Sequence, residues 1–435
     1  MNSILVVNDI NDINNLCVTH FSIDKGHYLA KSLVKLKHKV YFLTTLDDYE
    51  KDNLYYISTK NVTNSFLKDM DYILFAREAL FTDILEKVPS ISNIVSINKK
   101  ERIKPKIIIK SDCPIFYYDK SIRKKLNQRF GINGSSSSVN KWLIKHIDFI
   151  CAQNDDYKNI ALTNNIPATS LIVSNMGIPN KFIDYSKLVN PYIINHTYCV
   201  KNSSSMGNNR ALLPLYYLDD TKDKTKFNKL KYIIIYTGRV KVDSGRIFFN
   251  MRNIMEKLGE DYELHIFPGS FTIPLGETFT KHSAKNSNSL ELLRNTIFET
   301  NKNVIIHYPY EHHEKYMYLH FANCGIDFSD VRPRAIKGIS GHAKILEYCE
   351  VGLPIVCEEN INNIDLVING KNGIILPYMA SDEEYCQAIK KIVKTKIDRE
   401  YCRRVTIENE NWDKKAQELM NFLSSPHVAP QPSAT

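Results

Sequence analysis

An α/β protein with two doubly wound domains is the fold class that this sequence predicts. Short runs of β-branched and aromatic residues alternate with amphipathic stretches along both halves of the chain, a pattern typical of mainly parallel sheets covered by helices. The alternation stops over residues 186–230 and then restarts. The length of 435 residues also fits two domains, because one domain usually takes about 100–200 residues.

The first domain is expected over residues 1–185. Each expected strand is a short apolar run, and each expected helix repeats its apolar residues about every three or four positions. Strands are expected at 4–7, 40–44, 72–75, 106–109, 149–152 and 171–174, and helices at 28–36, 79–87, 141–147 and 155–163. Gly177 and Pro179 then break the pattern.

Residues 186–230 are expected to be a linker or insertion, because they combine a serine run with a charged run. The second domain is expected over residues 231–405. Its strands are expected at 232–236, 262–267, 304–307, 324–328 and 354–358, and its helices at 245–258, 288–300, 312–321, 342–350 and 382–395. A last helix near 411–423, within residues 406–425, precedes a flexible tail at 426–435.

The composition excludes several classes of protein. With 43% hydrophobic and 24% charged residues, the chain is an ordinary globular protein rather than a disordered or fibrous one. No apolar run approaches the roughly 20 residues of a membrane span, and the start is unlike a secretory signal. The nine cysteines form no C-x-x-C pair, which favours a reducing, cytoplasmic location. The absence of G-x-G-x-x-G after the first strand argues against a nicotinamide dehydrogenase.

The net charge of +9 is unevenly distributed. Between Lys99 and Arg129 there are eleven Lys or Arg residues against three acids. Such a stretch is either a solvated basic face or a patch for an anionic surface, such as a membrane or an anionic acceptor. We expect no nucleic-acid partner, because the stretch matches no recognition motif.

The most informative segment runs from Gly338 to Tyr348. Ser340, Gly341 and His342 open an expected helix, and free backbone N–H groups at such a start bind anions. Lys344 and Glu347 are three residues apart and so share one helix face. We expect one of them to reach a phosphate and the other to accept hydrogen bonds from sugar hydroxyls.

A second informative segment directly follows the first strand of the second domain. Gly238 and Arg239 stand there, with Lys241 close behind. An arginine at the carboxyl end of a strand is well placed to hold a diphosphate with two hydrogen bonds.

Taken in order, these motifs resemble nucleotide-sugar-dependent glycosyltransferases of the GT-B fold, close to family 4. The family has a Gly-Arg after the first strand of its second domain, a K-x-x-E helix followed by G-x-P-[VI]-V, a later G-x-N-G loop and a terminal helix that begins near a tryptophan. The corresponding residues here are Gly238-Arg239, Lys344 to Glu347, Gly352 to Val356, Gly370 to Gly373, and Trp412. The resemblance implies two Rossmann-like domains facing a cleft, with the C-terminal helix returning to the first domain.

The sequence departs from the family pattern at three places. Ile339 stands where the family often has a second Glu, eight residues before Glu347. Lys241 or Arg246 takes the place of the family Lys after Gly-Arg, and the sequence leaves open which of them does so. The glycine-rich loop near the amino terminus is reduced to Gly26.

The resemblance implies a role for each site residue. Arg239 and a neighbouring Lys neutralise the leaving diphosphate, Glu347 holds the ribose hydroxyls, and the backbone around Tyr308 and Tyr310 meets the base. Asp112, after the strand at 106–109, is the candidate for contact with the acceptor or the transferred sugar. The expected donor-binding set is Gly238, Arg239, Lys241, Tyr308, Tyr310, Ser340, Gly341, His342, Lys344 and Glu347.

The function expected from this resemblance is transfer of a sugar from a UDP- or GDP-sugar to a hydroxyl of a glycan, lipid or protein, with the anomeric configuration retained. No cofactor or metal is expected, because the histidines lack carboxylates at ligand spacing. Two alternatives stay open at this point. One is a nucleotide-sugar 2-epimerase of the same fold, and the other is a catalytically silent sugar- or membrane-binding module.

Overall fold

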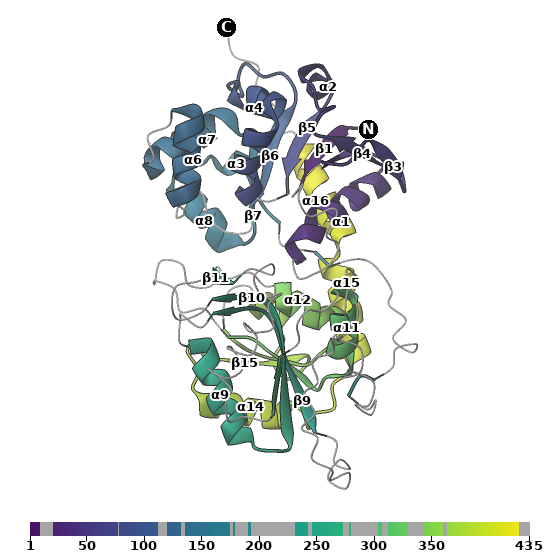
Figure 1. Ribbon diagram of the computed structural model, residues 1–435, viewed down its shortest axis with the longest axis vertical. Helices are drawn as coiled ribbons and strands as arrows, with labels where there is room; N and C mark the ends of the chain where they lie inside the picture. Colours follow the sequence, from purple (N-terminus) through teal and green to yellow (C-terminus); the bar gives the residue numbers. More distant parts are fainter. Residues whose placement is uncertain are drawn as a thin grey trace, which may run out of the picture. The chain divides into compact units, whose positions relative to one another are not determined.

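The chain is described here from a computed structural model (Figure 1). The described residues are 1–8, 21–76, 78–111, 120–131, 135–174, 177–178, 190–192, 231–241, 246–272, 278–279, 303–306, 312–328, 343–359 and 363–425. They divide into two compact units. The first holds the described residues up to 178 together with 409–425, and the second holds those from 190 to 408.

The first unit is built on a sheet whose strand order is β3-β4-β2-β1-β5-β6-β7-β8. All neighbouring strands are parallel except β3 and β4, which form an antiparallel hairpin. The strands are β1 (Ser3–Val7), β2 (Lys39–Thr44), β3 (Tyr49–Lys51), β4 (Leu54–Ser58), β5 (Tyr72–Phe75), β6 (Lys106–Ser111), β7 (Phe149–Ala152) and β8 (Leu171–Val173).

Both faces of this sheet are covered by helices. Successive side chains of a strand point to opposite faces, so Leu5 and Val7 of β1 join one buried cluster and Ile4 and Val6 join the other. The first cluster packs against α3 (Glu78–Lys87), α4 (Pro89–Ser96), α6 (Lys120–Phe130), α7 (Ser136–His146) and α8 (Asp155–Thr163). The second packs against α1 (Phe21–Lys35) and α16 (Trp412–Leu423). The short helix α2 (Asn64–Lys68) precedes β5.

The C-terminal helix α16 is an integral part of the first unit, as Figure 1 shows by its yellow ribbon beside the purple α1. Asn411 caps its start by accepting a hydrogen bond from Lys414 N at 2.8 Å. Trp412 is 2% exposed, and a Cβ added at Gly177 would lie 2.9 Å from its ring. Only glycine therefore fits at position 177. The predicted return of the last helix to the first domain is confirmed.

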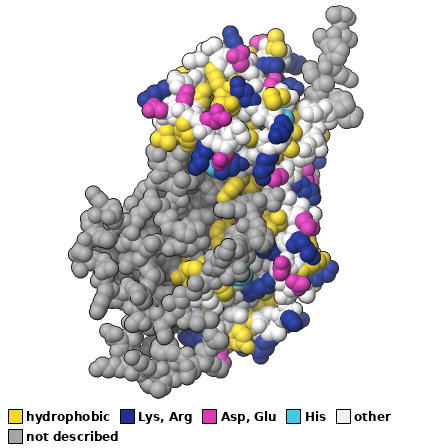
Figure 2. All heavy atoms as spheres, turned by 90° about the vertical axis from the view of Figure 1, so that its right-hand side faces the viewer, with side chains coloured by type: hydrophobic (Ala, Val, Ile, Leu, Met, Phe, Trp, Pro, Cys, Tyr) yellow, Lys and Arg dark blue, Asp and Glu magenta, His cyan; other side chains and the backbone are white. Residues whose placement is uncertain are grey.

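A surface ion pair also ties α16 to α1. Lys35 Nζ lies 2.8 Å from an Asp413 carboxylate oxygen, and Ser32 Oγ donates to the same carboxylate at 2.6 Å. On the face that Figure 2 shows, Lys and Arg side chains of the described residues are interspersed with Asp and Glu side chains. The described part of that face therefore carries charges of both signs.

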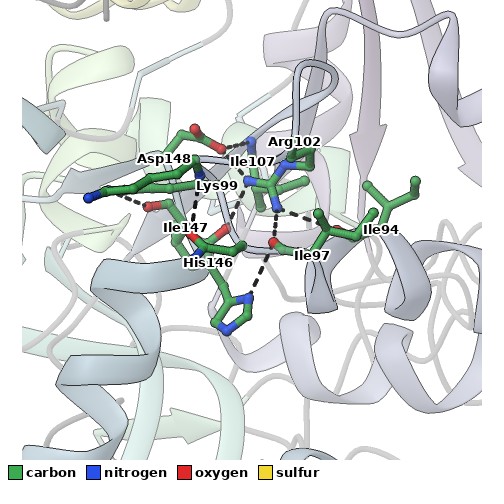
Figure 3. Close-up of polar contacts among 10 residues, drawn as sticks. Ile94, Ile97, Lys99, Arg102, Ile107, His146, Ile147 and Asp148 are labelled. Atoms are coloured by element: carbon green, nitrogen blue, oxygen red, sulfur yellow. Dashed lines mark hydrogen bonds and ion pairs between the residues drawn. The ribbon is translucent and has the colours of Figure 1, made fainter. Parts of the chain in front are cut away.

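A buried arginine joins three segments of the first unit (Figure 3). The Arg102 guanidinium donates to the backbone carbonyls of Ile97 at 3.0 Å and His146 at 2.8 Å, and it pairs with the carboxylate of Asp148. Asp148 also accepts from Ile107 N at 2.8 Å. Although the sequence counts Arg102 among the basic residues of 99–129, its side chain is 1% exposed.

Four other basic residues of that stretch are also engaged in internal contacts. Lys99 donates to Ile147 O, Lys104 pairs with Asp71, Lys110 donates to Ser174 O, and Arg129 donates to Ser92 Oγ. The stretch thus offers fewer outward-facing charges than its composition suggests. Contact between the stretch and an anionic membrane stays a prediction.

The second unit is built on a sheet whose strand order is β11-β10-β9-β13-β14-β15, with β12 paired to β10. All pairs are parallel except β10 with β11. The strands are β9 (Tyr232–Lys241), β10 (Tyr262–Thr272), β11 (Thr278–Phe279), β12 (Val304–Ile306), β13 (Cys324–Ile326), β14 (Ile355–Glu358) and β15 (Gly373–Leu376).

Helices cover this sheet on both faces as well. One buried cluster includes α9 (Arg246–Leu258) and α14 (Asp382–Ile392), and the other includes α11 (His312–Phe321) and α12 (Ala343–Glu350). The short α13 (Asn363–Leu366) follows β14, and α15 (Arg399–Glu410) precedes α16. The predicted fold class, α/β with two doubly wound parallel-sheet domains, is confirmed.

The structure adds elements that the sequence analysis did not predict. The hairpin β3–β4 turns at Asp52 and Asn53, which both have positive φ (55° and 61°). Such a pair is the signature of a tight two-residue turn that matches strand twist. The helix predicted at 141–147 begins earlier, at Ser136, because Ser135 caps it by accepting from Ser138 N. The helix predicted at 288–300 lies outside the described residues.

Among the described helices, none combines the length and the apolar character needed to cross a bilayer.

Candidate functional site

The predicted donor-binding residues that the structure describes gather at the carboxyl edge of the second sheet. Gly238 lies near the end of β9, and Lys344 and Glu347 face it from α12. Ligands of doubly wound sheets bind beyond the carboxyl ends of the strands. The three residues that the sequence analysis assigned to one site therefore lie close together in the structure.

Helix α12 presents one functional face to β9. Lys344, Glu347 and Tyr348 are spaced i, i+3 and i+4, so their side chains lie on the same side of the helix. The Tyr348 ring packs so closely on Gly325 that a Cβ there would lie 2.6 Å from the ring. Gly325 thus allows α12 to approach the sheet at this point.

The far end of α12 is fixed by a second glycine. Gly352 has φ +66°, and an added Cβ would lie 2.1 Å from the carbonyl oxygen of Arg399. The left-handed conformation and the close approach both require glycine. The structure therefore explains why the G-x-P-I-V motif that follows α12 begins with glycine.

Thr237 is held by two residues of α12. Its backbone N–H donates to the Tyr348 hydroxyl at 3.0 Å, and its hydroxyl donates to Glu347 Oε2 at 3.1 Å. The Tyr348 hydroxyl also lies 3.3 Å from the carbonyl oxygen of Ile326, to which it donates. Burial raises the pKa of the Tyr348 phenol, so it stays a neutral donor. Together these bonds fix the residue that precedes Gly238.

The Lys344 ammonium lies between an acid and an aromatic ring. Its Nζ is 2.6 Å from Asp327 Oδ1, 3.3 Å from the Tyr236 hydroxyl and 4.3 Å from the centre of the Tyr236 ring. Burial penalises the charged form, but attraction to Asp327 and Tyr236 outweighs this penalty, so the pKa of Lys344 is raised. Lys344 therefore remains a cation at neutral pH.

Gly238 gives the end of β9 its special conformation. Its φ of +105° is one that side-chain-bearing residues rarely adopt. The register between β9 and β10 shifts at the same place, where Pro268 pairs with Gly238 and Ser270 with Arg239. Such a bulge re-aims the residues beside it. Arg239 and Lys241 lie in β9, and their side chains are outside the described part of the structure.

The remaining predicted site residues are outside the described residues. These are Asp112, Tyr308, Tyr310, Ser340, Gly341 and His342, together with Ile339 at the departure from the family pattern. Their roles stay predictions. Which of Lys241 and Arg246 takes the place of the family Lys stays open.

The structure also adds residues that the sequence analysis missed. Asp327 directly follows β13 and Glu358 ends β14, and these acids are 5% and 0% exposed. The sequence pattern that could have predicted them is an acid at the end of an apolar run, because the end of a buried strand lies at the carboxyl edge of a parallel sheet. Tyr236 and Thr237, just before Gly238, were also missed: Tyr236 was assigned to the strand alone, and Thr237 to the segment after it with no role.

Across the described ranges, no three or more His, Cys, Asp or Glu side chains come together as a metal site would require.

No protein-family model matches the sequence, and no curated protein sequence matches it. Solved structures match over nearly the whole chain. Sucrose-phosphate synthase from Thermosynechococcus elongatus has a TM-score of 0.58 at 13% identity, with 97% of this chain and 98% of that chain covered. Trehalose-6-phosphate synthase OtsA has a TM-score of 0.60 at 10% identity, with 97% and 99% covered.

A third match is Anabaena HepE in complex with UDP-glucose. Its TM-score is 0.58 at 9% identity, with 98% of this chain and 100% of that chain covered. The fold is that of GT-B glycosyltransferases. At these identities the likeness establishes the shared GT-B fold, and membership of family 4 stays a prediction.

Proposed function

We propose that the protein is a glycosyltransferase that moves a sugar from a UDP- or GDP-sugar to a hydroxyl acceptor with retention of configuration. One observation carries the proposal. At the carboxyl edge of the second sheet, the left-handed Gly238 leads into Arg239, and α12 sets Lys344 and Glu347 against the same strand end. The structural neighbour HepE, solved with UDP-glucose and with UDP, supports a nucleotide-sugar donor.

The proposed chemistry is electrostatic. As the bond from the sugar to the diphosphate breaks, negative charge grows on the leaving phosphate, and positive groups already in place stabilise it. Lys344 is one such group, but the carboxylate of Asp327 already balances its charge. Arg239 is proposed to supply further positive charge to the diphosphate, as the resemblance to GT-B glycosyltransferases implies.

Glu347 is proposed to hold the ribose hydroxyls of the donor. Its side chain is 4% exposed, and one of its oxygens accepts from Thr237. This hydrogen bond from Thr237 orients the carboxylate at the end of β9. The proposed enzyme needs no metal, because side chains neutralise the diphosphate.

Binding and product analysis test this proposal together. We expect UDP- or GDP-sugars to raise the melting temperature of the parent protein, and Arg239→Ala and Glu347→Ala each to abolish most of that rise. Slow hydrolysis of the bound donor should release nucleoside diphosphate and free sugar of retained configuration, read by NMR. An epimerase would instead return an altered sugar, and a silent module would leave the donor intact. If both variants respond like the parent, the donor assignment is wrong.

A further inference from the structure

The proposed function leaves the buried acid beside Lys344 without a role of its own. Asp327 follows β13, its side chain is 7% exposed, and it pairs with Lys344 at 2.6 Å. A buried carboxylate beside a site for a polyanion is costly, because it repels the phosphate that the site must bind. Its place therefore calls for a specific explanation.

Asp327 is held rigidly by the sheet and by α14. Its backbone N–H donates to Val356 O at 3.0 Å, and its backbone carbonyl accepts from the Tyr385 hydroxyl at 2.7 Å. Tyr385 is fully buried. The carboxylate thus acts as a fixed point against which the flexible lysine side chain is oriented.

The Lys344 ammonium has three N–H donors. One is directed to Asp327 and a second to the Tyr236 hydroxyl at 3.3 Å, while the ring of Tyr236 lies beneath the charge. The third donor has no partner among the described residues. The side chain retains 15% exposure, so a ligand at the carboxyl edge can reach it.

We propose that Asp327 is a positioning residue, which holds the Lys344 ammonium at the carboxyl edge of the sheet so that its third N–H binds a diphosphate oxygen of the nucleotide-sugar. The inference rests on the proposed function and adds to it a residue that acts through Lys344 rather than on the substrate. Tyr236 assists by placing its ring under the same charge.

Two effects of removing the Asp327 charge oppose each other. Loss of the carboxylate removes a repulsion that the phosphate feels, which by itself would tighten binding. It also leaves a buried ammonium without its counter-charge and its fixed partner, so that the ammonium loses its orientation and its charge is less favoured. The positioning role requires that the second effect prevail.

Asp327→Asn is the matched test, because the amide keeps the shape and one acceptor oxygen. Calorimetry on the full chain should compare nucleoside diphosphate with nucleoside monophosphate, using UDP and UMP or GDP and GMP. We expect Asp327→Asn to weaken the diphosphate by about tenfold, as expected for a weakened hydrogen bond from a charged group, with the monophosphate nearly unchanged. Glu383→Gln, which removes an exposed acid paired with Lys257 at 3.3 Å, is the control and should bind like the parent.

A double-mutant cycle separates positioning from a general effect on structure. In a Lys344→Gln background, Asp327→Asn should no longer weaken diphosphate binding, because the loss passes through the ammonium. Melting curves of each variant establish that it is folded. Tyr236→Phe, which keeps the ring and removes the hydroxyl, should weaken the diphosphate less than Asp327→Asn does.

Three results would overturn the inference while leaving the proposed function standing. They are equal or tighter diphosphate binding by Asp327→Asn, an equal loss for monophosphate and diphosphate, and an undiminished loss in the Lys344→Gln background. If the parent binds neither UDP nor GDP, the proposed function fails and the inference with it. If the parent binds the diphosphate but transfers no sugar, the proposed function fails while the cycle still decides the role of Asp327.

Discussion

Each unit of this protein contains a buried ion pair, and the two pairs differ in what surrounds them. In the first unit, Arg102 pairs with Asp148 just before β7 begins, and backbone carbonyls of Ile94, Ile97 and His146 take further guanidinium donors (Figure 3). In the second unit, Lys344 meets Asp327 just after β13 ends, beside one phenol.

The difference concerns position and the kind of partner. The Arg102 pair lies at the amino ends of parallel strands, and main-chain oxygens accept from its two terminal guanidinium nitrogens. The Lys344 pair lies at the carboxyl ends, where doubly wound sheets bind their ligands, with a donor to spare among the described residues. A buried pair of the first kind holds segments together, whereas we propose that one of the second kind keeps a charge available to a ligand.

The largest expected effect breaks the first pair. Arg102→Met leaves Asp148 largely buried without its cation and several carbonyls without donors, so the free energy of unfolding should fall by about 3–5 kcal/mol. Denaturant titration of the full chain measures this. Lys104→Met, which removes the more exposed cation paired with Asp71, is the control and should leave the unfolding transition unchanged. A similar loss in the two variants would contradict the structural role given to Arg102.

A smaller loss of stability is expected beside the second pair, where α12 contacts the end of β9. Thr237→Val keeps the shape of the side chain but removes the donor to buried Glu347 Oε2. The free energy of unfolding should fall by about 1–3 kcal/mol, the usual cost of leaving a buried acceptor short of one partner. Donor affinity should fall too. Thr395→Val, which removes an exposed hydroxyl bonded to Lys391 O, is the control and should change neither quantity. If Thr237→Val also changes neither quantity, the role given to the Thr237–Glu347 hydrogen bond is wrong.

The smallest expected effect is a dependence of stability on pH, and it comes from His146, which lies beside the first pair. Burial, with nearby Lys145 and Arg102, lowers the pKa of His146 from its usual 6.5. The unfolded chain therefore takes up a proton first, so this contribution to stability is complete above about pH 6.5 and is lost as the pH falls toward the folded-state value.

Unfolding titrations between neutral and mildly acidic pH measure the His146 contribution. The stability difference between the parent and His146→Gln should shrink as the pH falls through this window. Because the pKa of Lys344 is raised, Lys344 should keep its charge throughout the window. A difference that stays constant with pH would contradict the assignment to His146.

Much of the fold could be predicted from the sequence, because strand and helix periods are strong in this chain. Strands such as Tyr72–Phe75 and helices such as Asp155–Thr163 lie where the pattern places them. The β3–β4 hairpin could not be read with the same ease, since its signal is two residues of positive φ rather than a hydrophobic period. Helix α15 was missed because it is polar over most of its length.

The site could be predicted only in part, for a related reason. Lys344 and Glu347 are near neighbours on one helix, so their common face follows from spacing alone. Asp327 reaches Lys344 across 17 positions and Arg102 reaches Asp148 across 46. Charge counts cannot show such pairings, and so Arg102 was assigned to a basic surface when it is buried.

Placing Trp412 and Leu419 in the core of the first unit has a consequence for how the protein is made. A ribosome delivers the sheet and α1 of that unit long before it delivers the helix that covers them. Until that helix has been synthesised, the apolar surface that it covers stays exposed. The nascent chain should therefore depend on chaperones up to that point, and a protein shortened before residue 412 should aggregate when expressed.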